Sequence, residues 1–167
     1  MASRDLNDLQ PDVADKARRL LQRCADEGLD LLVYCTLRPV AEQARLYRQG
    51  RPLRQIERKA EELRRRWRRP DLADLLMDVG PQYGARVTYA GPGQSMHNYG
   101  LALDAVPLRG GKAVWSARLP EDKALWERYG ALAEEVGLEW AGRWTRFREF
   151  PHVQRPGAAW RELIRPR

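Results

Sequence analysis

A series of amphipathic helical segments, bounded by proline and glycine, narrows the possible folds of this 167-residue chain more than any other feature. From Pro11 to Glu27, apolar residues recur at steps of three and four, with proline at the start and glycine directly after the end. This pattern is typical of a helix that packs one face on a core. Proline and glycine at the bounds also predict helices over Pro39–Gln49 and 120–137. A helical turn or two is predicted over 156–164.

Short apolar runs lie between these helices and have the length of strands. Leu29–Thr36 is predicted to be a buried strand, and 101–108 alternates enough to predict another. Residues 85–90 favour a third strand, and 147–154 favour extended chain because Pro151 biases the residue before it away from the helix. The stretch 137–144 is predicted to be irregular. The chain is therefore predicted to be α+β, and its length requires no more than one domain over 1–167.

The positive charge is concentrated in one segment. Arg51–Arg69 holds nine basic and three acidic residues, a net charge of +6, and leaves only +1 of the total +7 for the rest of the chain. A helical stripe runs through it, and Pro70 ends the helix before a further predicted helix over Asp71–Gly80. The members of the stripe are Ile56, Ala60, Leu63 and Trp67.

Two interpretations of the basic segment stay open: a solvated helix face, or a surface that concentrates the protein on an anionic polymer. A nucleic-acid binder spreads its basic residues over a surface and interleaves aromatic side chains, whereas this run offers only Trp67. We therefore expect no specific nucleic-acid partner.

No apolar run approaches the roughly 20 residues that a membrane-spanning helix needs. The first sixteen residues lack a basic start followed by an apolar block, so we expect no secretory signal and synthesis in the cytoplasm. Cys24 and Cys35 lie in apolar surroundings and are interpreted as buried free thiols, with a disulfide or ligand role as the alternative.

The only two histidines each lie near a carboxylate. His97 precedes Asp104 by seven residues, and His152 follows Glu149 by three. Imidazole and carboxylate suit a catalytic zinc, which keeps three protein ligands and one open position. A glycine turn at Gly100 would fold the chain back between the first two. The spacing by itself leaves the commoner alternative open, a histidine hydrogen-bonded to an aspartate.

The segment SMHNYGLALD, Ser95–Asp104, resembles the Ser-x-His-x-x-Gly-x-Ala-x-Asp signature of the zinc D-alanyl-D-alanine carboxypeptidase and L-alanyl-D-glutamate endopeptidase superfamily. EFPHVQ, residues 149–154, resembles its second signature. GLEWAGRW, residues 137–144, is similar to the endopeptidase branch, which includes many phage endolysins. The likeness covers about 4–154 and is broken at about 52–86, where this chain inserts its basic helix and the helix after it.

The resemblance implies a single small domain of hedgehog/DD-peptidase-like fold, with a small antiparallel sheet flanked by helices. It implies Zn²⁺ as cofactor, with His97, Asp104 and His152 as its ligands, and Glu149 as catalytic base. Arg38 matches the arginine that holds substrate and stabilises the developing oxyanion. Ser95 and Gln43 match positions that support the site.

The function that the resemblance implies is hydrolysis of the L-alanyl-D-glutamate bond in bacterial peptidoglycan peptide stems. We expect a monomer that reaches the wall after release during phage or prophage lysis. The alternatives are a D,D- or L,D-carboxypeptidase that removes terminal D-alanine, and a non-catalytic zinc-binding domain. The presence of both Glu149 and Arg38 argues against the last.

Overall fold

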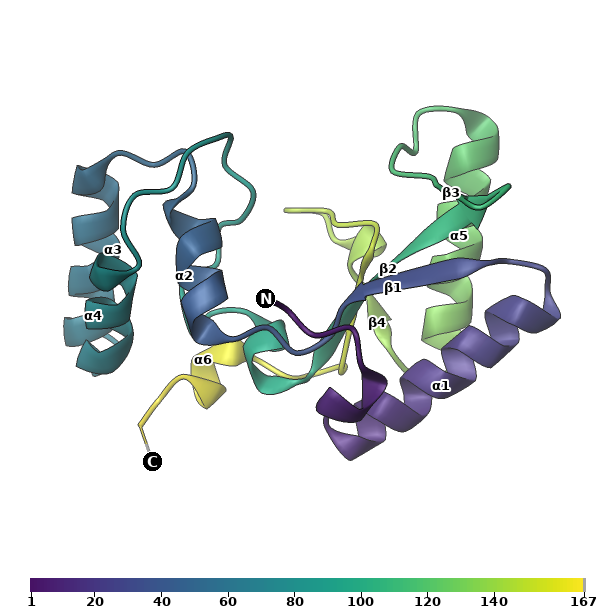
Figure 1. Cartoon of the computed structure of the whole chain (residues 1–167). Coiled ribbons are helices and arrows are strands. Elements are labelled where there is room, and N and C mark those ends of the chain that lie inside the picture. Colours follow the sequence, from purple (N-terminus) through teal and green to yellow (C-terminus); the bar gives the residue numbers. More distant parts are fainter. Residues whose placement is uncertain (167) are drawn as a thin grey trace. The chain divides into compact units, whose positions relative to one another are not determined.

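A computed structural model describes residues 1–166, and in that range the chain forms six α-helices and five β-strands (Figure 1). The elements divide between two compact units. The sheet unit comprises 3–37 and 100–158, and the helical unit comprises 1–2, 38–99 and the residues from Ala159 on. The predicted α+β class, with an antiparallel sheet flanked by helices, is confirmed. The assignment of 1–167 to one domain stays a prediction.

The sheet unit contains all the described strands, and every pairing between them is antiparallel. The order across the sheet is β1-β2-β5-β4, and β3 pairs with the far end of β2. The strands are β1 (Leu31–Cys35), β2 (Ala102–Arg109), β3 (Lys112–Ala113), β4 (Glu139–Trp140) and β5 (His152–Gln154). The central strand β2 is buried from Ala102 to Pro107, so it carries the core of this unit.

Two long helices, α1 (Pro11–Asp26) and α5 (Pro120–Glu135), pack on each other in the sheet unit. Each begins at a proline and ends before a glycine with positive φ, Gly28 and Gly137, as the sequence predicts. Two 3-10 turns, η1 (Leu6–Asp8) and η3 (Ala141–Arg143), belong to the same unit.

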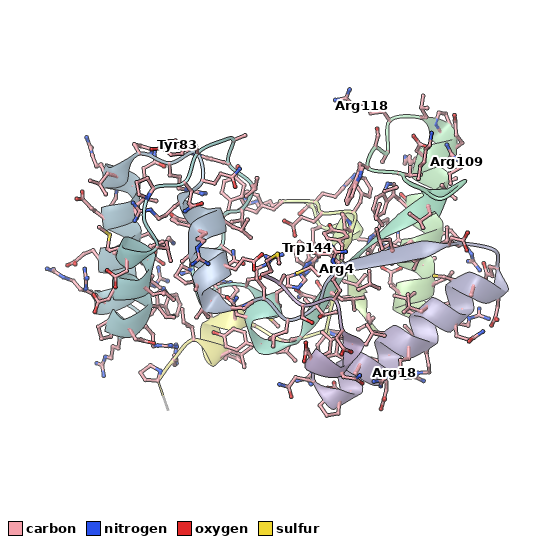
Figure 2. The ribbon with its side chains drawn as sticks, in the orientation of Figure 1. Arg4, Arg18, Tyr83, Arg109, Arg118 and Trp144 are labelled. Atoms are coloured by element: carbon pink, nitrogen blue, oxygen red, sulfur yellow. The ribbon has the colours of Figure 1, made fainter. Side chains whose placement is uncertain are left out.

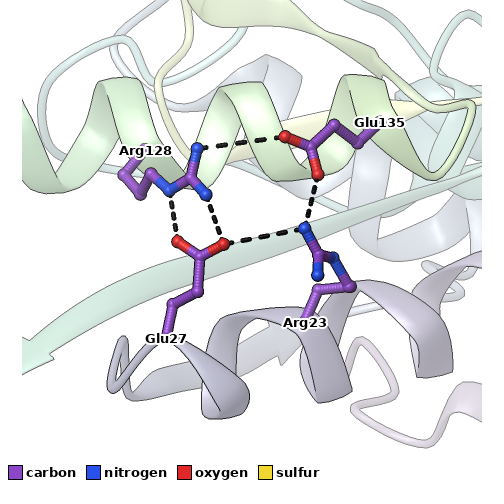
Figure 3. A network of polar contacts seen from close by, with 4 residues as sticks. All are labelled: Arg23, Glu27, Arg128 and Glu135. Atoms are coloured by element: carbon purple, nitrogen blue, oxygen red, sulfur yellow. Dashed lines mark hydrogen bonds and ion pairs between the residues drawn. The ribbon is translucent and has the colours of Figure 1, made fainter.

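Four charged side chains connect α1 to α5 at the surface (Figure 3). Arg128 binds both carboxylate oxygens of Glu27, and Arg23 Nη2 lies 2.8 Å from Glu135 Oε2. The hydrogen bonds from Arg128 hold the pKa of Glu27 below its ordinary value. Because water and salt screen exposed pairs, this network orients the two helices more than it stabilises them.

The helical unit is built on α2 (Val40–Arg48), α3 (Leu53–Arg65) and α4 (Pro70–Asp78), with the short α6 (Trp160–Leu163) and the 3-10 turn η2 (Met96–Tyr99). Most of its buried apolar residues form one hydrophobic cluster. The whole predicted stripe of the basic segment lies in this cluster: Ile56, Ala60, Leu63 and Trp67. The arginines of α3 consequently face water, and the insertion supplies most of the buried cluster of this unit.

Residues 85–90 do not form the predicted strand. Their backbone oxygens are bound by side chains instead: Arg51 Nη2 donates to Thr88 O at 2.6 Å, and Gln43 Nε2 donates to Ala90 O at 2.7 Å. Within residues 1–166 no strand of the helical unit offers them a pairing edge. Alternating apolar residues such as Val87 and Tyr89 are therefore exposed rather than buried.

Three further expectations need adjustment. The strand β1 is only partly buried, with Leu32 41% exposed, because it lies at the edge of the sheet. The stretch 137–144 is not wholly irregular, since β4 pairs with β5. Of 147–154 only β5 is extended strand, and Phe147 has a φ of 53°.

Cys24 and Cys35 are both buried, as expected, and neither forms a disulfide. Burial raises the pKa of Cys24 to about 11, which makes it a poor nucleophile. Among the helices within residues 1–166, none has the length and apolar content to cross a bilayer.

Candidate functional site

Asp104 and His152 face each other on neighbouring strands of the sheet unit. Asp104 of β2 is the direct partner of His152 of β5 in the antiparallel register, so both side chains leave the same face of the sheet. Asp104 Oδ1 lies 3.1 Å from His152 Nδ1, and both residues are buried. On the other side of β2, the register partner of Asp104 is Cys35 of β1.

The loop before β5 is fixed by side chains of the core. The hydroxyl of Tyr129 donates to Pro151 O at 2.9 Å, and the indole of Trp140 donates to Phe150 O at 2.7 Å. Complete burial raises the pKa of Tyr129 well above its ordinary value, and the charge of Asp104 adds to this, so Tyr129 remains a neutral donor. These bonds determine where His152 enters the sheet.

His152 continues into a chain of polar side chains. His152 Nε2 lies 3.0 Å from Gln154 Oε1, and Gln154 Nε2 lies 3.4 Å from Glu139 Oε2. Glu139 Oε1 accepts from Trp144 Nε1 at 2.7 Å, and the Trp144 ring packs 5.7 Å from the His152 ring. Sequence reasoning missed Gln154, Glu139 and Trp144. The two-residue spacing of His152 and Gln154 on one strand face was the available signal.

Glu149 lies in the loop between η3 and β5, and its side chain is exposed. Its backbone N–H donates to Ala141 O at 3.3 Å, and its carbonyl accepts from His152 N at 3.4 Å. The tight turn from Glu149 to His152 thus keeps the two residues close together, with the carboxylate in water rather than in the sheet.

The remaining expected site residues lie in the helical unit. Arg38 Nη1 donates to Gln43 Oε1 at 2.9 Å, and Gln43 is fully buried in α2. The Gln43 amide donates in turn to Ala90 O, so its orientation is fixed and its oxygen faces the guanidinium. Gln43 therefore holds the Arg38 side chain, and the supporting role predicted for Gln43 stays a prediction.

The backbone of Arg38 is tied to the segment that carries His97. Arg38 N donates to His97 O at 3.0 Å, and Asn98 Nδ2 donates to Arg38 O at 2.9 Å. His97 is buried in η2, and half-buried Ser95 accepts the N–H of Asn98 at its carbonyl. Two hydrogen bonds thus tie the backbone of Arg38 to the segment that carries His97.

Gly100 follows η2 with a φ of 67°, as the predicted glycine turn requires. A Cβ at this position would lie 2.9 Å from Asp8 O, so a side chain would clash with the backbone of the sheet unit. The turn lies within the run from His97 to Asp104, two residues before β2 begins.

The distance between Asp104 Oδ1 and His152 Nδ1 suits two ligands of one metal ion. Two ligand atoms at 2.0–2.1 Å from a tetrahedral zinc lie about 3.3 Å apart, close to the observed 3.1 Å. Imidazole nitrogen and carboxylate oxygen are both ordinary zinc ligands. The sheet unit by itself offers two of the three protein ligands that a catalytic zinc requires, and the expected role of His97 as the third stays a prediction.

Residues 89–155 match the family model described as D-alanyl-D-alanine carboxypeptidase, a span that includes both signatures. The peptidoglycan L-alanyl-D-glutamate endopeptidase CwlK of Bacillus subtilis is 30% identical over 152 residues, covering 89% of this chain and 74% of CwlK. The L-alanyl-D-glutamate peptidase of Listeria phage A118 is 26% identical over 150 residues. That match covers 90% of this chain but only 39% of the phage protein.

Two solved structures share the fold. The L-Ala D-Glu endopeptidase ChiX of Serratia marcescens has a TM-score of 0.53 at 17% identity, covering 98% of this chain and 92% of ChiX. The vancomycin-resistance D,D-pentapeptidase VanY, solved with Zn(II), has a TM-score of 0.51 at 14% identity, covering 93% and 78%. With CwlK similar along most of both chains, this protein belongs to the D-alanyl-D-alanine carboxypeptidase and L-alanyl-D-glutamate endopeptidase superfamily of peptidoglycan metallopeptidases.

Proposed function

We propose that this chain is a zinc-dependent endopeptidase that hydrolyses the L-alanyl-D-glutamate bond of peptidoglycan stem peptides. The observation that carries the proposal is the opposed pair Asp104 and His152. Their side-chain atoms Oδ1 and Nδ1 lie 3.1 Å apart on one face of the sheet. CwlK and the phage A118 peptidase, named for this bond, support the choice of substrate.

In this proposal His97, Asp104 and His152 hold one zinc ion. Zinc in such a site polarises a carbonyl group and lowers the pKa of a bound water molecule to about 7. The zinc complex of VanY supports the choice of metal. The burial of Asp104 and His152 supports a strong interaction with a cation there, since charges act more strongly at a buried site than in solution.

Glu149 and Arg38 supply the remaining chemistry. The carboxylate of Glu149 accepts the proton of the attacking water and donates it to the leaving amine nitrogen. The guanidinium of Arg38, held by Gln43, donates to the scissile carbonyl oxygen as negative charge develops there. Ser95 supports the loop that carries His97.

The cellular role we propose is that of a lysis enzyme, released to the wall from a phage or prophage. The phage A118 relative supports this setting. This chain matches 39% of that relative's length, so the proposal concerns the peptidase part alone.

Mass spectrometry of muropeptides after digestion of purified peptidoglycan tests the proposal. A new N-terminal D-glutamate identifies the endopeptidase. Loss of terminal D-alanine with intact L-alanyl-D-glutamate bonds would instead identify a D,D- or L,D-carboxypeptidase, the alternative that the matching family description favours. Digestion by the Glu149→Gln variant is the control for a contaminating peptidase.

A further inference from the structure

A row of polar side chains leads from His152 through Gln154 and Glu139 to Trp144, which is labelled in Figure 2. Gln154 lies two residues after His152 on β5, and its direct partner on β4 is Glu139. All of these residues belong to the sheet unit, so the row is defined within one body. Its members differ in whether they can donate or accept a hydrogen bond, and this difference fixes which residue is the donor at each step of the row.

The donor and acceptor roles follow from Trp144, at one end of the row. An indole N–H only donates, and an ionised carboxylate only accepts, so Glu139 accepts from Trp144 and from the amide NH₂ of Gln154. The amide oxygen of Gln154 then faces His152. Because an amide oxygen only accepts, the hydrogen of a neutral His152 ring is held on Nε2.

The opposite ring nitrogen consequently keeps its lone pair. Nδ1 of His152 then faces Asp104 Oδ1 across 3.1 Å, and two acceptors at that distance repel each other. A cation between them turns the repulsion into coordination by two ligands. The row therefore prepares His152 for a metal ion rather than for a plain histidine–aspartate hydrogen bond, the alternative that the sequence left open.

We propose that Gln154, oriented by Glu139, is a positioning residue that holds His152 in the Nε2–H tautomer and thereby presents Nδ1 as the zinc ligand. This inference rests on the proposed zinc site. Outer hydrogen bonds of this kind orient a ligating histidine, and their loss typically costs about 10–100-fold in metal affinity.

The tautomer can be read directly, because the chain has only two histidines. In metal-free protein, ¹⁵N NMR of the rings should show the neutral form of His152 almost wholly as the Nε2–H tautomer. The His97→Ala variant assigns the two signals. Gln154→Met, which fills the same space without an acceptor, should give a mixture of both tautomers. An unchanged His152 spectrum in Gln154→Met would overturn the inference.

Zinc affinity, measured by competition with a chelator, gives the second readout. We expect Gln154→Met to bind zinc about 10–100-fold more weakly than wild type. The paired exchange Glu139→Gln with Gln154→Glu keeps the order of donors and acceptors along the row and should restore most of the affinity. Either exchange alone breaks that order and should not. Far-UV circular dichroism checks the fold of each variant, and the paired exchange decides the matter if Gln154→Met does not fold.

Equal zinc affinity in wild type and Gln154→Met would contradict the inference, as would a paired exchange no better than its single components. Failure of the proposed function looks different, since wild type itself would then bind no zinc. The tautomer measurement on metal-free protein still judges the role of Gln154 in that case.

Discussion

The two units position their candidate site residues by different means. In the sheet unit, Asp104 and His152 are opposed by the register of β2 and β5, so backbone hydrogen bonds fix their spacing. In the helical unit, Arg38 and His97 lie outside α-helices and strands, and bonds from individual side chains such as Gln43 and Asn98 hold their segment. A ladder distributes its support over many bonds, whereas one substitution can remove much of the support of a loop.

The segment 85–95 shows most clearly how individual side chains hold a loop. Glu62 of α3 accepts from Gln94 Nε2 at 3.3 Å, and Gln94 Oε1 accepts from Gly91 N at 3.0 Å. Lys59 Nζ donates to Glu62 at 2.6 Å and reaches Gln94 at 3.3 Å. The inserted helix thus holds the loop that leads into His97.

The largest effect we expect comes from the chemistry assigned to the sheet unit. Glu149→Gln keeps the shape of the side chain but removes the proton acceptor, so turnover should fall by roughly two to four orders of magnitude. Zinc content should not change, because Glu149 is assigned no ligand role. Kinetics on purified peptidoglycan and elemental analysis of the same sample measure both. Loss of zinc in this variant would make Glu149 a ligand and reverse the assignment.

The matching test in the helical unit is Arg38→Ala. Loss of a donor to the developing oxyanion should lower turnover by about 10²–10³-fold while zinc is retained. Arg38→Lys keeps the positive charge but loses the forked geometry that Gln43 orients, so it should recover only part of the activity. Activity of Arg38→Ala close to that of wild type would remove Arg38 from the mechanism.

Glu62→Gln tests whether the inserted helix supports the loop before His97. Burial raises the pKa of Glu62, but hydrogen bonds from Lys59 and Trp67 outweigh it, and the net shift is downward. A lowered pKa means that the carboxylate stabilises the fold above the ordinary carboxyl pKa and loses this contribution as pH falls through the lowered value.

We therefore expect Glu62→Gln to lower the free energy of unfolding at pH 7 by about 1–3 kcal/mol. The difference from wild type should shrink as the solution is acidified below about pH 4. Urea unfolding at both pH values measures it. Glu61→Gln is the control, because Glu61 is exposed and pairs with exposed Arg65. Equal losses in the two variants would mean that Glu62 has no special role.

The smallest effect concerns the exposed arginines of the basic segment. Changing Arg58, Arg65, Arg66 and Arg68 to Gln removes positive charge, and Arg69 is kept because it donates to Asp71 and to Ile164 O. Binding to intact peptidoglycan at low salt should weaken by up to about tenfold. The difference should vanish as salt rises, since exposed charges act over about 10 Å at 0.1 M.

Hydrolysis of a small soluble peptide should not change. Equal wall binding at every salt concentration would favour the solvated helix face.

The helix starts and ends were predictable because prolines and glycines mark them locally, as at Pro11 and Gly137. The stripe of α3 was predictable because a helical period needs no knowledge of its partner. The chain of Gln154 and Glu139 was not, because it depends on the pairing of β4 with β5, which the sequence does not state. The absence of a strand at 85–90 likewise depends on distant partners such as Arg51.

The ligand set of His97, Asp104 and His152 stays a prediction. Elemental analysis of purified wild type, His97→Ala, Asp104→Ala and His152→Ala tests it most directly. We expect about one zinc per wild-type chain and loss of most of it in each variant, because a catalytic zinc needs three protein ligands. Full zinc in His97→Ala, with losses confined to Asp104→Ala and His152→Ala, would contradict the role of His97 as a ligand.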